Sequence, residues 1–139
     1  MSAPKKPMIR HLAIITLDPE RMAKYYCDVF EMERLSTPGA GGSKAVYLTD
    51  GYLTLALLEN KAEGKPSGLN HFGFQVADQE EIVERMARHG VKRPAKRPAD
   101  RAFAETRGTD PDGNNFDLSV RGYDEREIAA AKKPESVSV

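Results

Sequence analysis

Apolar and polar residues alternate along the stretch Ile9–Leu17 (IRHLAIITL). This alternation is typical of a β-strand that has one face in a core and the other face turned away from it. Leu12 and Ile14 fall on one face, and His11 falls on the other with Ala13. The stretch therefore predicts a strand that carries an imidazole on the side away from its main apolar contacts.

A second stretch with the same alternation lies near the middle of the chain. Asn70–Val76 (NHFGFQV) has three apolar residues at alternate positions, and His71, Gly73 and Gln75 lie between them. The residues Asp110–Leu118 (DPDGNNFDL) combine the chemistry of a tight turn with the start of another strand. The same pattern predicts further strands over Ala45–Thr49, Tyr52–Leu58, Ala102–Arg107 and Asn115–Val120.

Helical spacing of apolar residues follows each of the two histidine-bearing strands. Asp18 and Pro19 form a favourable helix start, with an N-capping carboxylate and a proline in the first turn. The apolar positions then continue to about Phe30 or Met32. Asp78 is the expected cap of a second helix over about Gln79–His89.

The order of elements repeats along the chain, and matching residues lie 60 positions apart. His11 corresponds to His71, and Asp18 corresponds to Asp78. A repeat of this kind predicts two βαβββ modules that form a curved mixed sheet around a cleft, which is an α+β fold. The expected divisions are an N-terminal tail 1–8, one domain 9–123 with module one at about 9–60 and module two at about 69–123, and a charged C-terminal tail 124–139.

Three side chains fall on the face of this sheet that the helices leave open. They are His11, His71 and Asp117, and Asp117 alternates with the apolar residues of its strand. Two imidazoles and one carboxylate form a facial triad, which suits Fe, Mn, Zn, Ni or Co as a divalent ion. A structural role, in which each histidine only makes hydrogen bonds, is the simpler alternative.

Composition limits the remaining possibilities. The 21 basic and 21 acidic residues balance, so no net charge draws the 139-residue chain to nucleic acid or to an anionic membrane. No apolar run approaches the roughly 20 residues that span a bilayer, and the polar N-terminus does not resemble a signal peptide. The one cysteine, Cys27, excludes an intramolecular disulfide, and together these features favour a cytoplasmic protein.

The same residues carry a family resemblance. The segments Ile9–Met32, Leu69–Asp78 and Asp110–Val120 resemble the vicinal oxygen chelate superfamily, which includes glyoxalase I, extradiol dioxygenases, methylmalonyl-CoA epimerase and the fosfomycin- and bleomycin-resistance proteins. The resemblance spans nearly the whole chain. It implies paired βαβββ modules and a metal held by His11, His71 and Asp117, with Asp in place of the more usual Glu.

The resemblance also implies two departures from its better-known members. A glyoxalase-type site has a fourth ligand on the last strand of module one, and we expect that position, equivalent to Asp117, to be Thr54. Threonine is a poor ligand for a divalent metal. A ring-cleaving dioxygenase would carry a tyrosine ten residues before its carboxylate ligand, where this chain has Arg107.

The alternation of the strands places other side chains beside the expected metal. Arg107 in such a cleft could bind a carboxylate or phosphate of a substrate, or form a salt bridge at the surface. No residue is assigned as catalytic. The full set expected to line the substrate cleft is Tyr47, Thr54, Gln75, Arg107 and Ser119.

These features favour a metal-dependent enzyme that acts on a small oxygenated substrate by lyase, isomerase or dioxygenase chemistry. The alternative is a non-catalytic protein of the resistance type that binds a small molecule. A regulatory module with a vestigial site also fits the fold. Members of the superfamily commonly pair, and open sheet edges would favour pairing, so we expect a homodimer.

Overall fold

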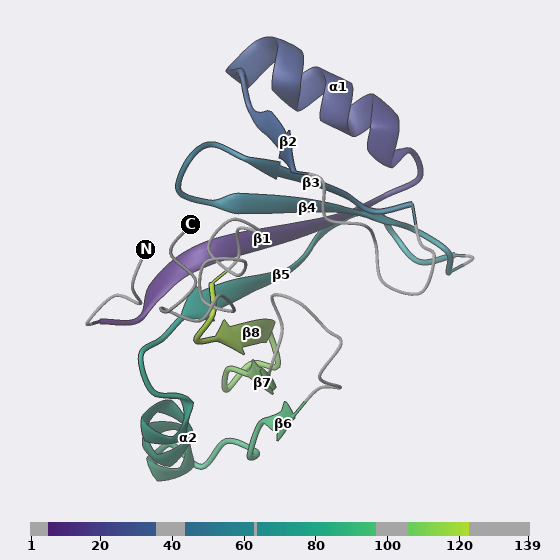
Figure 1. Cartoon of the computed structure of the whole chain (residues 1–139). Helices are drawn as coiled ribbons and strands as arrows, with labels where there is room; N and C mark the ends of the chain where they lie inside the picture. The colour runs from purple at the N-terminus through teal and green to yellow at the C-terminus, as the bar shows by residue number, and fades with distance from the viewer. Residues whose placement is uncertain (1–5, 36–43, 63, 97–105, 123–139) are drawn as a thin grey trace, which may run out of the picture.

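The computed structural model describes residues 6–35, 44–62, 64–96 and 106–122, which form one sheet and two helices (Figure 1). The strands follow one another across the sheet in the order β2-β3-β4-β1-β5-β8-β7-β6. The sheet is mixed, curved and not closed, which confirms the expected α+β fold. The elements are β1 Met8–Thr16, α1 Pro19–Phe30, β2 Glu33–Leu35, β3 Val46–Thr49, β4 Thr54–Glu59, β5 Gly68–Gln75, α2 Gln79–Arg88, β6 Ala95–Lys96, β7 Thr106–Thr109 and β8 Asn115–Ser119.

The two modules meet at the centre of the sheet, where β1 and β5 pair antiparallel. His11 lies opposite Gly73 in this pairing, and Ala13 lies opposite His71. In each module the first and last strands are parallel neighbours, β1 beside β4 and β5 beside β8. The predicted equivalence of the two histidine-bearing strands is therefore present in the hydrogen-bonded register.

Both helices begin where the sequence predicts. Asp18 accepts a hydrogen bond from the backbone nitrogen of Arg21 at 3.1 Å, and Pro19 occupies the first turn of α1. Asp78 accepts from two backbone nitrogens of the first turn of α2, at 3.0 and 3.3 Å. Each carboxylate satisfies amide groups that have no partner within the helix.

One apolar cluster lies beneath each helix. Ala23 of α1 and the β4 residues Leu55 and Leu57 are buried together, with Leu12 and Ile14 of β1 packed against them. In module two, the side chains of β5 and β8 form the equivalent cluster with α2; its members are Val76, Phe116 and Leu118, flanked by Phe72, Phe74, Ile82 and Met86. The other face of the sheet, here called the inner face, consequently carries His11 and the residues in phase with it.

Some boundaries differ from the prediction. β4 begins at Thr54, because Asp50 Oδ1 accepts from the backbone nitrogens of Tyr52 and Leu53 and extends the turn. β2 was not predicted: it is three residues long and forms by pairing with β3. Residues 102–105 of the predicted strand 102–107 and the predicted C-terminal tail 124–139 lie outside the described residues, as does the predicted loop 36–43. The predicted N-terminal tail 1–8 lies outside them for residues 1–5, and its last residue, Met8, is instead the first residue of β1, because it pairs with Gln75.

Candidate metal centre

Three strands bring the predicted triad together on the inner face of the sheet. His11 comes from β1, His71 from β5 and Asp117 from β8, and all three are buried. Asp117 Oδ2 lies 3.2 Å from His71 Nε2 and 3.8 Å from His11 Nε2. The two imidazole rings lie 5.4 Å apart between centroids. Residues from both modules thus converge on one carboxylate oxygen.

The donor set fits a divalent metal ion. One ligand atom from each of the three residues lies within 4.8 Å of the others. Ligands bound at about 2.0–2.2 Å around one ion lie about 3 Å apart, a spacing that these side chains reach by small rotations. Two nitrogens and one carboxylate oxygen leave further positions for substrate or water, which is the arrangement that metal catalysis needs.

Burial keeps His11 neutral. Burial, together with the neighbouring imidazole of His71, lowers the pKa of His11 to about 4, although the charge of Asp117 acts in the opposite direction. A neutral imidazole offers a lone pair to a metal without first losing a proton. At neutral pH His11 is therefore ready to act as a ligand.

A neighbouring side chain orients His71. Its Nδ1 atom lies 2.6 Å from Asn70 Oδ1, an oxygen that can only accept a hydrogen bond. Nδ1 consequently carries the proton, and the lone pair of Nε2 points toward Asp117. Metal-binding histidines characteristically have such an outer partner, because it fixes both the tautomer and the ring orientation.

Arg107 of β7 completes the group of charged residues around Asp117. Burial by itself raises the pKa of the Asp117 carboxyl, but hydrogen bonds and charges from His71 in its doubly protonated form and from Arg107 outweigh it, so the pKa lies below its ordinary value. Arg107 Nε donates to Asp117 Oδ1 at 2.9 Å. Asp117 is accordingly a carboxylate at neutral pH, with one oxygen on Arg107 and the other facing the histidines.

A structured turn before β8 sets the position of Asp117. Asp110 Oδ1 accepts from the backbone nitrogens of Asp112 and Asn114, at 3.0 and 2.9 Å. Gly113 has a φ of 88°, which most residues avoid. These contacts explain why the DPDGNN sequence delivers β8 in a fixed register, with Asp117 on the inner face.

The expected equivalence between Thr54 and Asp117 is wrong. Asp117 lies opposite Arg107 in its hairpin, and in module one the equivalent pair is Ala56 and Tyr47. Ala56 also lies opposite Ala13 of β1, as Asp117 lies opposite Gly73 of β5. The position of a fourth ligand is therefore occupied by alanine, which has no donor atom.

The other residues predicted to face the substrate lie on the strands of the inner face. Thr54 is buried and lies opposite His11, and Tyr47 is half-buried on β3. Gln75 accepts a hydrogen bond from Arg10 Nη1 at 2.6 Å. The Ser119 hydroxyl donates to the carbonyl of Gly122 at 3.1 Å. Their contact with a substrate remains a prediction.

The sequence prediction missed Arg10. The β1–β5 register shifts between Ile9 and His11, and this irregularity lets the Arg10 side chain reach Gln75 on the inner face. Arg10 Nε also donates to the backbone oxygen of Tyr52 at 2.7 Å, and its guanidinium lies over the Tyr52 ring. Two adjacent polar residues within an apolar strand were the available signal, because simple alternation would bury Arg10 among apolar side chains.

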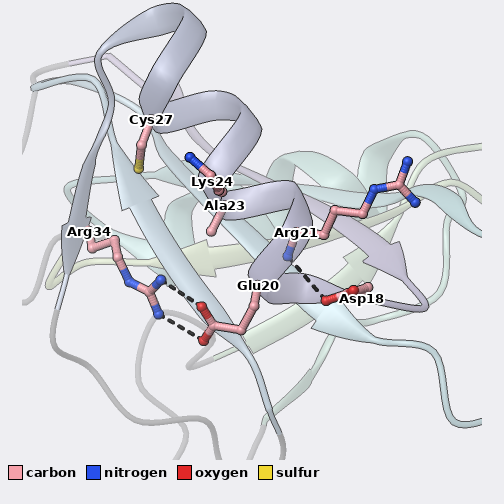
Figure 2. Close-up of a pocket in the computed structure, with 7 residues that line it drawn as sticks. All are labelled: Asp18, Glu20, Arg21, Ala23, Lys24, Cys27 and Arg34. Carbon is pink, nitrogen blue, oxygen red and sulfur yellow. Dashed lines mark hydrogen bonds and ion pairs between the residues drawn. The ribbon is translucent and has the colours of Figure 1, made fainter.

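A depression of about 590 Å³ lies on the other side of the sheet, beside α1 (Figure 2). Two of its basic residues pair with carboxylates: Arg34 donates twice to Glu20, at 2.7 and 2.9 Å, and Lys24 donates to Asp28. Cys27 lies at its rim. This depression is separate from the triad, which faces away from α1.

Comparison with known proteins agrees with this geometry. The sequence profile of the Glyoxalase/Bleomycin resistance protein/Dioxygenase superfamily matches residues 8–118. The chain belongs to this superfamily. The match runs from β1 to β8 and therefore includes both modules and all three triad residues. No curated protein matches the chain in sequence.

Solved structures share the superfamily fold at low sequence identity. A hypothetical protein, BH1468 from Bacillus halodurans C-125, has a TM-score of 0.62 at 18% identity, covering 82% of this chain and 94% of its own. Methylmalonyl-CoA epimerase from Mycobacterium tuberculosis also has a TM-score of 0.62 at 18% identity, with 79% and 85% covered. A single-residue variant of the Streptomyces coelicolor epimerase, in complex with 2-nitronate-propionyl-CoA, has 0.62 at 21%, with 83% and 96% covered. At such identities the likeness establishes the fold alone.

Within the described residues, no helix has both the length and the apolar character to cross a membrane.

Proposed function

We propose that this superfamily member is a divalent-metal-dependent enzyme of the isomerase or lyase type that acts on a small substrate with neighbouring oxygen atoms. The observation that carries the proposal is the convergence of His11, His71 and Asp117, whose ligand atoms lie within 4.8 Å of one another. Their burial supports it as well, because charged groups interact more strongly away from water.

A bound divalent ion would polarise the substrate oxygens and stabilise negative charge on them. The protein's own part is to hold that position. His11 offers a neutral nitrogen, Asn70 orients His71, and Asp117 supplies the single negative charge. Among the inner-face positions of the described strands, Asp117 is the one buried carboxylate. Glu33 of β2, which pairs with Thr49, lies on the same face but is exposed, so the group that would move a proton is not assigned.

Proton transfer beside a carbonyl is the first reaction to test. The epimerase names of several solved structures with this fold favour isomerase chemistry, although only through the fold. Ring-cleaving dioxygenase chemistry has less support. The position where the resemblance implies a tyrosine is Arg107, which pairs with Asp117 instead of standing ready as an acid or base.

A resistance-type binding protein remains the alternative function. The contact between Arg107 and Asp117 is the observation that favours it, because a guanidinium provides the buried carboxylate with a cation of its own. Such a protein would bind its ligand without turnover. Metal analysis separates the two functions.

The test starts from purified full-length protein. We expect one divalent ion per chain by elemental analysis or by calorimetric titration with Zn²⁺ and Mn²⁺. His71→Ala should abolish stoichiometric binding, and His89→Ala, which alters a histidine beyond the end of α2, should retain it. Deuterium incorporation next to the carbonyl of small oxo acids and acyl thioesters, followed by NMR, would then identify isomerase chemistry. Absence of ion binding by the wild-type protein would contradict the proposal.

A homodimer remains a prediction of this proposal. In the described residues the strands at the two edges are short, with three residues in β2 and two in β6, and short edges disfavour strand pairing between chains. Exposed apolar side chains offer another surface: Tyr25, Val29 and Phe30 of α1 are each more than half exposed. Sedimentation velocity would distinguish the dimer from the monomer.

A further inference from the structure

Arg107 contacts two of the three groups that would bind the metal ion. Its Nε donates to Asp117 Oδ1 at 2.9 Å, and its Nη2 lies 3.2 Å from His71 Nε2. The Arg107 side chain is 30% exposed and the Asp117 side chain is 2% exposed. The guanidinium therefore extends from the solvent-accessible rim of the site to its buried ligand atoms.

The contact with His71 involves the atom that a metal would bind. Because Nδ1 donates its proton to Asn70 Oδ1, Nε2 has a lone pair and accepts a hydrogen bond from Arg107 Nη2. A metal ion would use the same lone pair, at about 2.1 Å from the nitrogen. One lone pair cannot serve both cations.

Charge adds to this conflict. A divalent ion bound to His71 and Asp117 would lie within a few ångströms of the guanidinium, and like charges at such a distance in a buried site repel strongly. Arginine keeps its charge under all ordinary conditions, so loss of a proton cannot relieve the repulsion. Movement of the side chain can relieve it, since Arg107 comes from the partly exposed rim of the site.

We propose that Arg107 is an internal cation that competes with the divalent metal for Asp117 and His71, so that metal binding requires the guanidinium to leave both groups. This inference rests on the proposed function, because it assigns a regulator of metal affinity to the same site. Module one has no such competitor, since Tyr47 occupies the position equivalent to Arg107. The competition is thus a property of module two.

Calorimetric titration with Zn²⁺ and Mn²⁺ tests the inference through the sign of a change in affinity. Arg107→Gln removes the competing charge and should tighten ion binding by about tenfold or more. Arg107→Lys keeps the charge but loses the forked geometry that reaches both Asp117 and His71. The ion affinity of this variant should therefore lie between those of the wild type and Arg107→Gln. An arginine that merely orients Asp117 would behave in the opposite way, because loss of an outer partner weakens metal binding by roughly 10–100-fold.

Arg34→Gln is the matched control. Arg34 also pairs with a carboxylate, Glu20, beside α1 (Figure 2). Helix α1 packs on the face of the sheet opposite to the triad. Replacement of Arg34 removes the same charge and should leave ion affinity unchanged. Circular dichroism shows whether each variant is folded. If Arg107→Gln does not fold, the ion affinity of Arg107→Lys is compared with that of the wild type instead, and tighter binding by Arg107→Lys is again the result that competition predicts.

The outcomes separate the inference from the proposed function. Tighter binding by Arg107→Gln than by a wild-type protein that itself binds an ion supports competition. Equal or weaker binding by Arg107→Gln, with binding by the wild type, overturns the competition and leaves the metal-dependent function standing. If the wild-type protein binds no ion, the proposed function fails and this inference fails with it.

Discussion

The two modules have the same backbone plan and different chemistry. Each contributes one histidine at the same place, His11 on β1 and His71 on β5, at the junction where these strands pair. The last hairpins differ: Tyr47 and Ala56 face each other in module one, where module two has Arg107 and Asp117. The comparison shows that repetition of the fold supplies two nitrogen ligands, and that a local substitution in one module supplies the acid.

This difference makes the site asymmetric. All of the negative charge comes from the side of module two, and so does the cation that neutralises it. Module one contributes a neutral imidazole and the two small residues Ala13 and Ala56. A metal at the junction would thus be held by both modules, but its charge would be balanced by one.

The largest expected effect is on stability at acidic pH. The pKa of His11 falls from 6.5 to about 4 on folding, so between these values the unfolded chain binds a proton that the native protein does not. Stability is therefore complete above about pH 6.5 and is lost as the pH falls toward 4, by up to about 1.4 kcal/mol per pH unit. Urea denaturation at several pH values, with a chelator present, measures this slope.

His11→Gln provides the comparison for that experiment. The variant cannot bind the proton, so its stability should depend less steeply on pH between about 4 and 6.5. Slopes that agree between the wild type and the variant would show that His11 is not held neutral by burial.

The second expected effect tests the corrected equivalence between the modules. Ala56→Asp places a carboxylate at the position that corresponds to Asp117 and should tighten Zn²⁺ binding by about tenfold, which is about 1.4 kcal/mol. Thr54→Asp adds the same charge two residues away on the same face and should have a smaller effect. If Thr54→Asp binds more tightly than Ala56→Asp, the register-based equivalence is wrong.

The smallest expected effect tests the similarity of the modules outside the site. Asp18→Ala and Asp78→Ala each remove a helix N-cap and should each lower stability by about 1 kcal/mol. Asp78 accepts from two backbone nitrogens and Asp18 from one, so the loss at Asp78 should be slightly larger. Thermal unfolding measures both as a shift of a few degrees. A much larger loss at Asp18 would contradict this ranking.

Much of this arrangement could be predicted from the sequence. The alternation of residues 9–17 and 70–76 identified which face of each strand carries its histidine, because a strand repeats every two residues. The caps Asp18 and Asp78 and the triad likewise follow from local patterns.

The features that were missed depend on pairing between strands. The hairpin of module one closes at Thr49 and Thr54, and that of module two closes at Thr109 and Asn115. The second loop is one residue longer, so the offset between the modules grows from 60 positions at the histidines to 61 after the loop, which makes Ala56 the equivalent of Asp117. The match of Thr54 with Asp117 requires an offset of 63 instead. The irregularity that brings Arg10 to the inner face is likewise a matter of register with β5.

The contact between Arg107 and His71 could not be predicted for a different reason. A side chain of this length reaches several neighbours from one strand position, and the sequence favoured neither an anion site nor a salt bridge. The structure places its guanidinium against both Asp117 and His71.

The central claim is that one histidine from each module and the aspartate of module two hold a single ion. X-ray absorption spectroscopy of the Zn²⁺-loaded protein tests it most directly, because imidazole rings give a distinctive scattering pattern that can be counted. We predict one ion per chain with two imidazole ligands and one carboxylate ligand in the wild type, and any ion retained by His71→Ala should show fewer imidazoles. A wild-type spectrum without imidazole scattering, or one that His71→Ala leaves unchanged, would contradict the account.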